Sequence, residues 1–184
     1  MLQVRFHGRG GQGVVTTAEL LSAAAFLEDR HAQAFPVFGS ERTGAPVAAF
    51  CRIDDAPIRT HDPVTEPDVL VIQDPTLLHQ VDLFSGVPDG ATVLINTARS
   101  VEQLGLTDVA TRFRILSVPA SELARTHLGR PMPGAPLLAA LAADTGVVTL
   151  DSVVAAIEER FSGADATGNV AAARAAHARE LERC

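Results

Sequence analysis

The residues most able to do chemistry in this chain are glycines near its start. Gly8, Gly10 and Gly13 satisfy the spacing G-x-G-x-x-G, and Gly11 adds a fourth residue without a Cβ. Glycine permits positive φ and close backbone approach, which a chain needs when a strand turns at once into a helix. The first turn of that helix presents unpaired N–H groups at the positive end of its dipole. Such a turn suits an anion, most often a phosphate.

The elements on either side of the glycines favour this interpretation. Residues 2–6 are typical of a short strand, and a helix is expected over residues 14–27. A strand before the glycines and a helix after them is the setting in which this spacing binds phosphate. Thr16 has a second interpretation, because threonine at a helix start often bonds only to the backbone. The candidate phosphate-binding residues are Gly8, Arg9, Gly10, Gly11, Gln12, Gly13 and Thr16.

A dinucleotide such as NAD would need one more feature. In an NAD-binding fold, an acidic residue about 20 positions after the first glycine ends the second strand and holds the ribose. Glu28 and Asp29 have that spacing, but they precede the next expected strand, residues 31–35. The placement weakens the NAD interpretation and leaves it open as an alternative.

A second glycine-containing loop lies between Pro36 and Pro46, with Gly39, Glu41, Arg42 and Gly44. Loops on a rigid scaffold often carry ligand or subunit contacts. The residues alone favour a simpler interpretation, a solvated turn whose surface ion pair contributes little to stability.

The composition excludes several functions. A net charge of −7 argues against nucleic acid as the main partner, because phosphate backbones need a basic face. All 15 basic residues are arginine, so a Walker A lysine and a Schiff-base lysine are both excluded. Two cysteines, Cys51 and Cys184, are too few for an iron–sulfur cluster or a structural zinc site. We expect Cys51 to be a buried, inert thiol of a strand.

The sequence also lacks the patterns of a metal site, a serine hydrolase and a membrane span. The six histidines form no i, i+4 pair, so no metal site is expected, and no Gly-x-Ser-x-Gly elbow indicates a serine hydrolase. His7 could face a ligand, but a satisfied structural histidine is favoured. No apolar run approaches the roughly 20 residues that span a bilayer. An expected strand from Leu2 leaves no room for a signal peptide, which predicts a cytoplasmic protein without a membrane partner.

Apolar runs along the rest of the chain predict a sheet. Val69–Ile72 is continuously apolar, as expected of a strand buried on both faces, and Asp74 is expected to cap a short helix after it. Further strands are expected over residues 47–53, 92–95 and 112–118, and Pro119 is expected to open a helix that reaches about Leu128. From Ala135 onward the pattern is helical, and residues 169–181 are expected to form the last helix. Before it, an amphipathic helix capped by Thr149 or Asp151 is marked by Val153, Val154, Ile157 and Phe161. We therefore expect one α/β domain over residues 1–184. It should be Rossmann-like, with a mostly parallel sheet flanked by helices and a helical C-terminal third.

The string Gly8-Arg-Gly-Gly-Gln-Gly13 resembles the opening of gamma subunits of 2-oxoacid:ferredoxin oxidoreductases, the pyruvate and ketoisovalerate family. The resemblance continues at residues 35–47, which look like that family's Gly-x-Glu-Arg-x-Gly loop, and at residues 52–58 and 66–72. It favours a ligand or subunit contact for the second loop. One segment differs, because residues 131–136 read Pro-Met-Pro-Gly-Ala-Pro where the family often has an Asn-led segment.

The resemblance implies a role within a larger enzyme. That family's complexes oxidatively decarboxylate a 2-oxoacid on thiamine diphosphate and Mg, pass electrons through iron–sulfur clusters to ferredoxin, and transfer the acyl group to coenzyme A. Thiamine diphosphate, Mg and the clusters would reside on partner chains: alpha and beta subunits, with a delta subunit in some complexes. This chain would complete the assembly and present its glycine turn to a phosphate-bearing group such as coenzyme A.

Two alternatives remain open from the sequence. The chain could be a free-standing nucleotide-binding module or NAD(P)-dependent enzyme built on the same turn. It could also be a purely structural assembly subunit whose glycine turn packs against a partner and binds nothing. Which 2-oxoacid the complex would use is not encoded in any motif of this chain.

Overall fold

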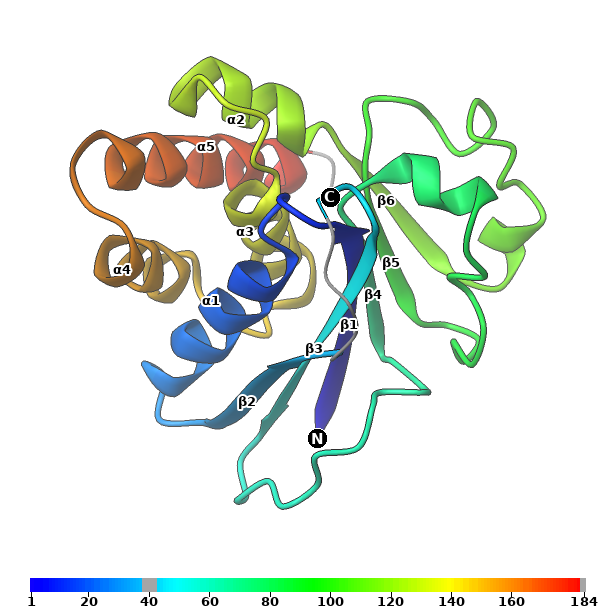
Figure 1. Ribbon diagram of the computed structural model, residues 1–184, viewed down its shortest axis with the longest axis horizontal. Helices are drawn as coiled ribbons and strands as arrows, with labels where there is room; N and C mark the ends of the chain where they lie inside the picture. The colour runs from blue at the N-terminus through cyan, green and yellow to red at the C-terminus, as the bar shows by residue number, and fades with distance from the viewer. Residues whose placement is uncertain (38–42, 183–184) are drawn as a thin grey trace.

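A single six-stranded sheet forms the centre of the molecule (Figure 1). The computed structural model describes residues 1–37 and 43–182. The strands lie in the order β2-β3-β1-β4-β5-β6. Their bounds are β1 Leu2–Arg9, β2 His31–Pro36, β3 Pro46–Asp54, β4 Val69–Ile72, β5 Thr92–Asn96 and β6 Arg114–Val118.

The sheet is mixed but mostly parallel, as the sequence predicts. β1, β4, β5 and β6 run parallel, whereas β3 is antiparallel to both of its neighbours, β1 and β2. The crossover from β1 to β2 therefore skips one place in the sheet, and β3 fills it. In a dinucleotide-binding unit the second strand lies next to the first. Here β2 is separated from β1 by β3.

Five described helices lie on one side of the sheet, two of them against the strands and the others mainly on neighbouring helices (Figure 1). Their bounds are α1 Val14–Phe26, α2 Ala120–Leu128, α3 Gly134–Thr145, α4 Leu150–Arg160 and α5 Gly163–Leu181. The other face, over β4 and β5, is covered by loops with two short 3-10 helices, η1 Pro75–His79 and η2 Val109–Thr111. None of the described helices is both long and apolar enough to cross a membrane.

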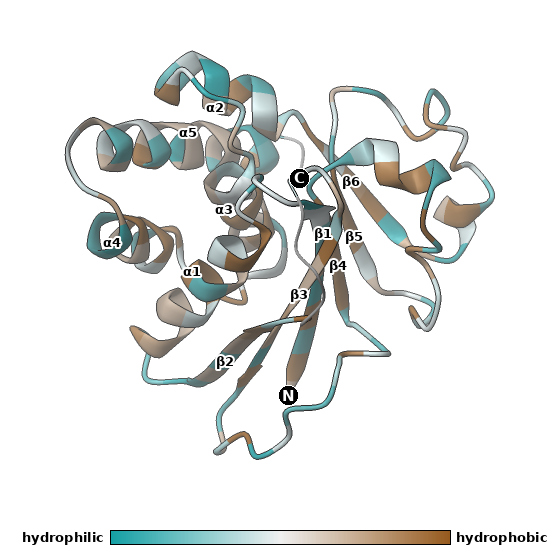
Figure 2. Ribbon diagram, in the orientation of Figure 1, coloured by the Kyte–Doolittle hydropathy of each residue, from teal (hydrophilic) through white to brown (hydrophobic). Residues whose placement is uncertain are grey.

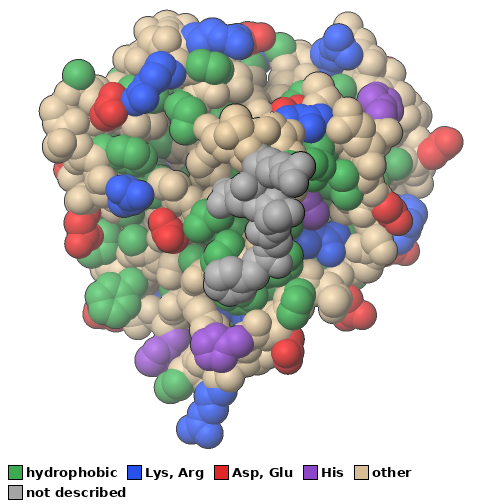
Figure 3. Space-filling model, in the orientation of Figure 1, with side chains coloured by type: hydrophobic (Ala, Val, Ile, Leu, Met, Phe, Trp, Pro, Cys, Tyr) green, Lys and Arg blue, Asp and Glu red, His purple; other side chains and the backbone are tan. Residues whose placement is uncertain are grey.

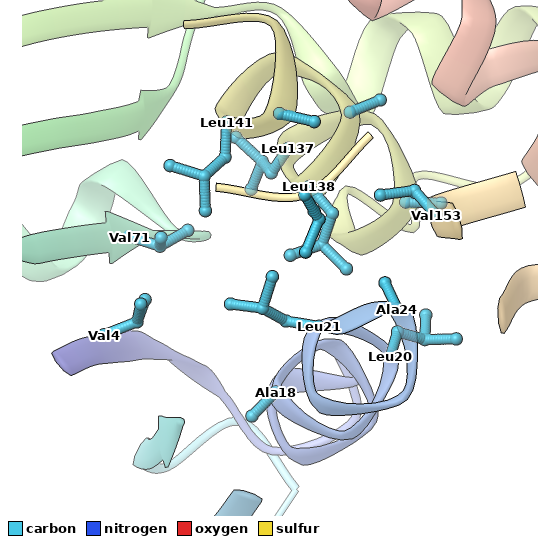
Figure 4. Close-up of a cluster of buried hydrophobic side chains, with 14 of the residues drawn as sticks. Val4, Ala18, Leu20, Leu21, Ala24, Val71, Leu137, Leu138, Leu141 and Val153 are labelled. Atoms are coloured by element: carbon cyan, nitrogen blue, oxygen red, sulfur yellow. The ribbon is translucent and has the colours of Figure 1, made fainter. Parts of the chain in front are cut away.

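The main core lies where the sheet meets α1 and α3. Val4 of β1 and Val71 of β4 point toward Leu21 of α1 and Leu138 of α3, and all four side chains are buried (Figure 4). The alternation of β1 sends Val4 and Phe6 to this face and Arg5 and His7 to the other. This packing fixes α1 against the sheet and so fixes the glycine turn at its start.

Two predicted boundaries are wrong by three residues or more. β1 extends through Arg9 and not only to residue 6, because β3 pairs with it along its whole length, up to Arg9 opposite Pro46. The last helix begins at Gly163, six residues before the predicted Asn169, since its first turns pack near α2. Of the two caps considered for α4, Thr149 is the one whose side chain accepts a hydrogen bond, from the Ser152 N–H.

Candidate functional site

The glycine turn between β1 and α1 has two residues in the left-handed region. Gly11 has φ 90° and Gly13 has φ 71°, a conformation that glycine adopts without a steric penalty. Gly13 is also the N-cap of α1, and no side chain caps that helix. The expectation of glycine-specific geometry is thus confirmed at these two residues.

Gly8 and Gly10 do not supply the left-handed turn but have other structural roles. Gly8 belongs to β1, where a Cβ would lie 2.6 Å from Cγ2 of Val14 and 3.2 Å from Cβ of Gln73. Gly10 is tied to the second loop, because its N–H donates to the Ala45 carbonyl at 2.9 Å. Gly8 therefore permits close packing of α1 on the sheet, and Gly10 joins the two loops.

Arg9 and Gln12 are used to close the turn. The Arg9 guanidinium lies 3.2 Å from the Asp74 carboxylate and donates to Thr76 Oγ1 at 2.8 Å. Gln12 donates to the same carboxylate at 2.7 Å and accepts from the Arg9 N–H at 2.8 Å. Arg9 is predicted to bind phosphate, but its guanidinium is already paired with Asp74, because β1 and η1 bring the two side chains together.

Asp74 is the centre of this network. Its side chain accepts from the Thr76 N–H at 2.9 Å, so the predicted cap is confirmed at the start of η1. Burial acts to raise the pKa of Asp74, but hydrogen bonds from Thr76 and Gln12, together with the charge of Arg9, bring it below its usual value. The carboxylate is therefore ionised at neutral pH and holds the turn against η1.

A buried chain of polar side chains lies beneath the turn. Gln73 follows β4 and donates to Thr17 of α1 at 2.6 Å, and Thr17 donates to the Gly13 carbonyl at 2.8 Å. Asn96, at the end of β5, donates to the Gln73 carbonyl and to Ser121, each at 2.8 Å. Gln73 is 1% exposed, and its Oε1 has no hydrogen-bond partner among the described residues.

Sequence reasoning missed these polar residues, although a signal existed. Gln73 directly follows the buried apolar strand β4, and Asn96 is the last residue of β5, both strands of the parallel part of the sheet. Because parallel strands end at the same edge, polar residues directly after them converge there. Thr17 carries no such signal, because a threonine inside an apolar helix usually bonds only to its own backbone.

His7 differs from the prediction of a satisfied structural histidine. Its Nε2 is buried and has no hydrogen-bond partner in the described part of the chain. Burial, and then the nearby charge of Arg5, lower the pKa of His7 to about 4. His7 is therefore neutral at physiological pH.

A cavity of about 180 Å³ opens beside the turn, between the starts of α1, α3 and α5. Thr16, one of the predicted residues, lines it together with Gln12 and Gly13. Arg130 and Arg160 also line it, and Arg130 pairs with Asp165 of α5 at 2.7 Å. Helix starts carry partial positive charge, so the starts of α1, α3 and α5 add to the charge of the two arginines, whereas Asp165 in the same lining opposes it. No sequence motif marks these two arginines.

The segment that departs from the family pattern forms one wall of this cavity. A Cβ on Gly13 would lie 3.3 Å from the methyl carbon of Met132. A Cβ on Gly134 would lie 2.3 Å from Thr17 Oγ1, so α3 starts in direct contact with α1. Met132, Gly134 and Ala135 of this segment thus line the cavity next to the glycine turn.

The second loop is described only in part. Gly39, Glu41 and Arg42 lie outside the described residues, and their predicted contact stays a prediction. Gly44 has φ 83°, and its carbonyl accepts from the Arg9 guanidinium at 3.0 Å. This end of the second loop therefore belongs to the same network as the glycine turn.

The acidic residues that NAD would need are far from the turn. Glu28 follows α1 and accepts from the Thr149 N–H at 2.7 Å and from the Ser152 hydroxyl at 2.5 Å. It therefore lies at the opposite end of α1 from Gly13, roughly 20 Å away at 1.5 Å per residue. Glu28 serves the start of α4 and not a ribose.

The described residues contain no group of three or more histidine, cysteine or acidic side chains that could hold a metal ion. Cys51 lies fully buried in β3, and burial raises the pKa of its thiol to about 12. The prediction of an inert thiol at Cys51 is confirmed.

Comparison with known proteins identifies the family. Residues 3–179 match the family described as pyruvate ferredoxin/flavodoxin oxidoreductase. The chain is 48% identical over 176 residues to the pyruvate/ketoisovalerate oxidoreductases common subunit gamma of Thermococcus kodakarensis, covering 96% of this chain and 95% of that one. This chain belongs to the pyruvate ferredoxin/flavodoxin oxidoreductase family. It is also 45% identical to pyruvate synthase subunit PorC of Methanothermobacter marburgensis, with 96% of each chain covered. The prediction that this chain is a gamma-type subunit of an oxidoreductase of this family is confirmed.

Solved structures agree with this chain in fold. Pyruvate oxidoreductase subunit PORC of Thermotoga maritima superposes with a TM-score of 0.82 at 33% identity, covering 96% of this chain and 95% of that one. The 2-oxoglutarate:ferredoxin oxidoreductase of Magnetococcus marinus superposes with a TM-score of 0.75 at 13% identity. All of this chain is covered there, but only 31% of the longer one, so the same fold occurs within a larger polypeptide.

Proposed function

We propose that this chain is the gamma subunit of a thiamine-diphosphate- and iron–sulfur-dependent 2-oxoacid:ferredoxin oxidoreductase, and that its glycine turn binds a phosphate of coenzyme A. The observation that carries the ligand proposal is the uncapped start of α1. Gly13 is left-handed, no side chain caps the helix, and a cavity lies directly against it. An uncapped helix start beside a cavity with arginines is a site for an anion.

The residues around the cavity fit part of a coenzyme A molecule. Its volume of about 180 Å³ is below the range of cavities that enclose a whole ligand. It would hold a phosphate or diphosphate group, and the rest of the molecule would lie outside. The α1 N–H groups and Arg160 would hold the phosphate oxygens, with Arg130 at the cavity edge. Guanidinium groups match phosphate oxygens in geometry as well as in charge.

The chain's task in the reaction would be binding and orientation. Coenzyme A supplies the thiol that accepts the acyl group in this family's reaction. Nothing in the described residues of this chain offers a cluster of metal ligands, and Cys51 is buried. We therefore assign thiamine diphosphate, Mg and the clusters to alpha and beta partner subunits, with a delta subunit where the complex has one. Ferredoxin would be reached through the complex.

Two alternatives give different results in the same experiment. An NAD-binding module would need an acid near the turn, and Glu28 is committed elsewhere. A purely structural subunit would bind neither ligand. The test is a calorimetric titration of the assembled complex with coenzyme A and with NAD. We expect binding of coenzyme A and none of NAD. Tight NAD binding with no response to coenzyme A would overturn the proposal, and no response to either would favour the structural role.

A further inference from the structure

A groove of about 480 Å³ lies between the C-terminal half of α1 and the edge strand β2. Most of its lining is apolar, with Ala32 and Ala34 of β2 half-buried inside it. Phe26 and Leu27, at the end of α1, are 73% and 48% exposed. Figure 2 shows this end of α1 in the brown of hydrophobic residues. Large apolar side chains gathered on a surface groove are typical of an interaction site.

The free edge of β2 belongs to the same surface. β2 is the last strand of the sheet and pairs only with β3, so its outer backbone groups have no strand beside them among the described elements. Its sequence, His-Ala-Gln-Ala-Phe-Pro, contains no charged residue, whereas the other edge strand, β6, begins with Arg114. Edge strands that face solvent are normally protected by charges, prolines or bulges. Only Pro36, at its very end, protects β2.

The rim of the groove is acidic. Glu19 of α1 and Glu159 of α4 both line it and are exposed. Arg30 lies nearby in sequence, but Asp55 holds it at 3.0 Å and the Val147 carbonyl at 3.2 Å. In Figure 3, hydrophobic side chains reach the surface at the lower left with acidic groups around them. A partner of this groove should therefore combine apolar side chains with positive charge.

The charges argue against a second copy of this chain as the occupant. A symmetric dimer would place Glu19 and Glu159 of one copy close to the same residues of the other. Like charges opposed in this way weaken association, and the whole chain carries a net charge of −7. A different chain with basic residues would meet no such repulsion.

We infer that the β2 edge and this groove bind an extended apolar segment, flanked by arginine or lysine, from another subunit of the oxidoreductase complex. The segment would add a strand to β2 and place alternate side chains in the groove. The inference rests on the proposed function as a complex subunit. The groove lies at the opposite end of α1 from the glycine turn, so the two sites can be occupied together.

The test measures the affinity of the purified chain for its partner subunits by biolayer interferometry. Phe26→Ser and Ala34→Lys change the groove, and Glu159→Arg reverses its rim charge. Leu181→Ser removes a similarly exposed apolar side chain, 55% exposed at the end of α5, and Glu122→Arg reverses a charge on α2. We expect the first three to weaken assembly about tenfold or more, and the two controls to leave it unchanged. Thermal melting of Phe26→Ser should match the wild type, because its side chain is exposed.

The outcomes separate this inference from the proposed function. If the wild-type chain assembles and all five variants assemble equally, the groove is not the docking surface, and the proposed function stands. If the wild-type chain dimerises by itself and Phe26→Ser abolishes the dimer, a second copy is the occupant and the inference is wrong. If the wild-type chain binds none of the partner subunits, the proposed function fails as well. Weaker wild-type assembly at higher salt would support an electrostatic rim.

Discussion

At the scale of single residues, two side chains that the sequence predicts to bind a ligand take part in building the glycine turn. Arg9 and Gln12 hold Asp74, and that carboxylate in turn holds η1. The positions left for a ligand are the backbone of the α1 start and the arginines across the cavity. Binding here would depend on backbone geometry, which makes glycine substitutions more informative than removal of Arg9.

The half-buried His7, whose Nε2 is buried, predicts a pH dependence of stability. Its folded-state pKa of about 4 lies below the usual 6.5, because burial and the charge of Arg5 disfavour the protonated ring. Below pH 6.5 the unfolded chain therefore binds more protons, and stability falls as the pH drops toward 4. A shift of this size amounts to about 3 kcal/mol when complete.

The measurement is urea unfolding of the wild type and His7→Gln between pH 7.5 and pH 4. Glutamine keeps a polar side chain and does not titrate in this range. The wild type should lose on the order of 3 kcal/mol more than the variant over this interval. Parallel pH profiles would show that His7 is accessible to water or paired in solution.

The Arg9–Asp74 network predicts a second pH effect, at lower pH. The pKa of Asp74 is lower in the folded state than in the unfolded state. The ionised carboxylate therefore stabilises the fold at pH values above its unfolded-state pKa, and this stabilisation is lost as the pH falls through the folded-state pKa. Asp74→Asn should therefore flatten the acid side of the stability profile. The matched control is Asp89→Asn, whose exposed pair with Arg112 should contribute roughly 0–1 kcal/mol. Equal acid profiles for both variants would contradict a structural role for Asp74.

At the scale of elements, the sequence predicted the strands and helices well where the pattern is local. Val69–Ile72 is a strand at the predicted bounds, and α1 ends within one residue of its prediction. The length of β1 was not predictable, because its last residues are held by β3, which is distant in sequence: Arg9 lies opposite Pro46. The cavity was not predictable either, since Arg130 and Arg160 come to line it beside Gly13 only through the packing of α2 to α5.

The contact of α5 with α2 gives a prediction at this scale. A Cβ on Gly168 would lie 2.9 Å from the Leu128 Cα and 3.0 Å from the His127 carbonyl oxygen, both backbone atoms. Alanine normally stabilises a helix over glycine by roughly 0.5–1 kcal/mol. Here Gly168→Ala should instead destabilise the protein by about 1–3 kcal/mol, because α2 must move.

Ala175→Gly, in the same helix and half-buried, is the matched control. It should cost roughly 0.5–1 kcal/mol, as in an ordinary helix. Both free energies are measured by chemical unfolding. A stabilised Gly168→Ala protein would mean that α2 and α5 are further apart than the structure has them.

At the scale of the whole molecule, the proposed ligand site and the proposed docking groove lie at opposite ends of α1. The glycine turn, the buried polar chain and the cavity lie where β1, β4 and β5 end, and the apolar groove lies at the far end of α1. We therefore expect the chain alone to show no 2-oxoacid oxidation. The assay is reduction of a viologen dye with 2-oxoacid, thiamine diphosphate and coenzyme A. Dye reduction by this chain without partner subunits would contradict its role as a subunit.

The measurement that tests the central claim most directly is the Michaelis constant for coenzyme A in the reconstituted complex, with the wild type, Gly13→Ala and Gly90→Ala chains. Both glycines have positive φ, at 71° and 86°, so both substitutions strain the backbone, but a Cβ on Gly90 meets nothing within 4 Å. Loss of a charge-assisted hydrogen bond costs about 1.5–3 kcal/mol. The account predicts a rise of roughly ten- to a hundredfold in the constant for coenzyme A in Gly13→Ala alone, with the constant for the 2-oxoacid unchanged. An unchanged constant for coenzyme A in a folded, assembled Gly13→Ala complex would contradict it.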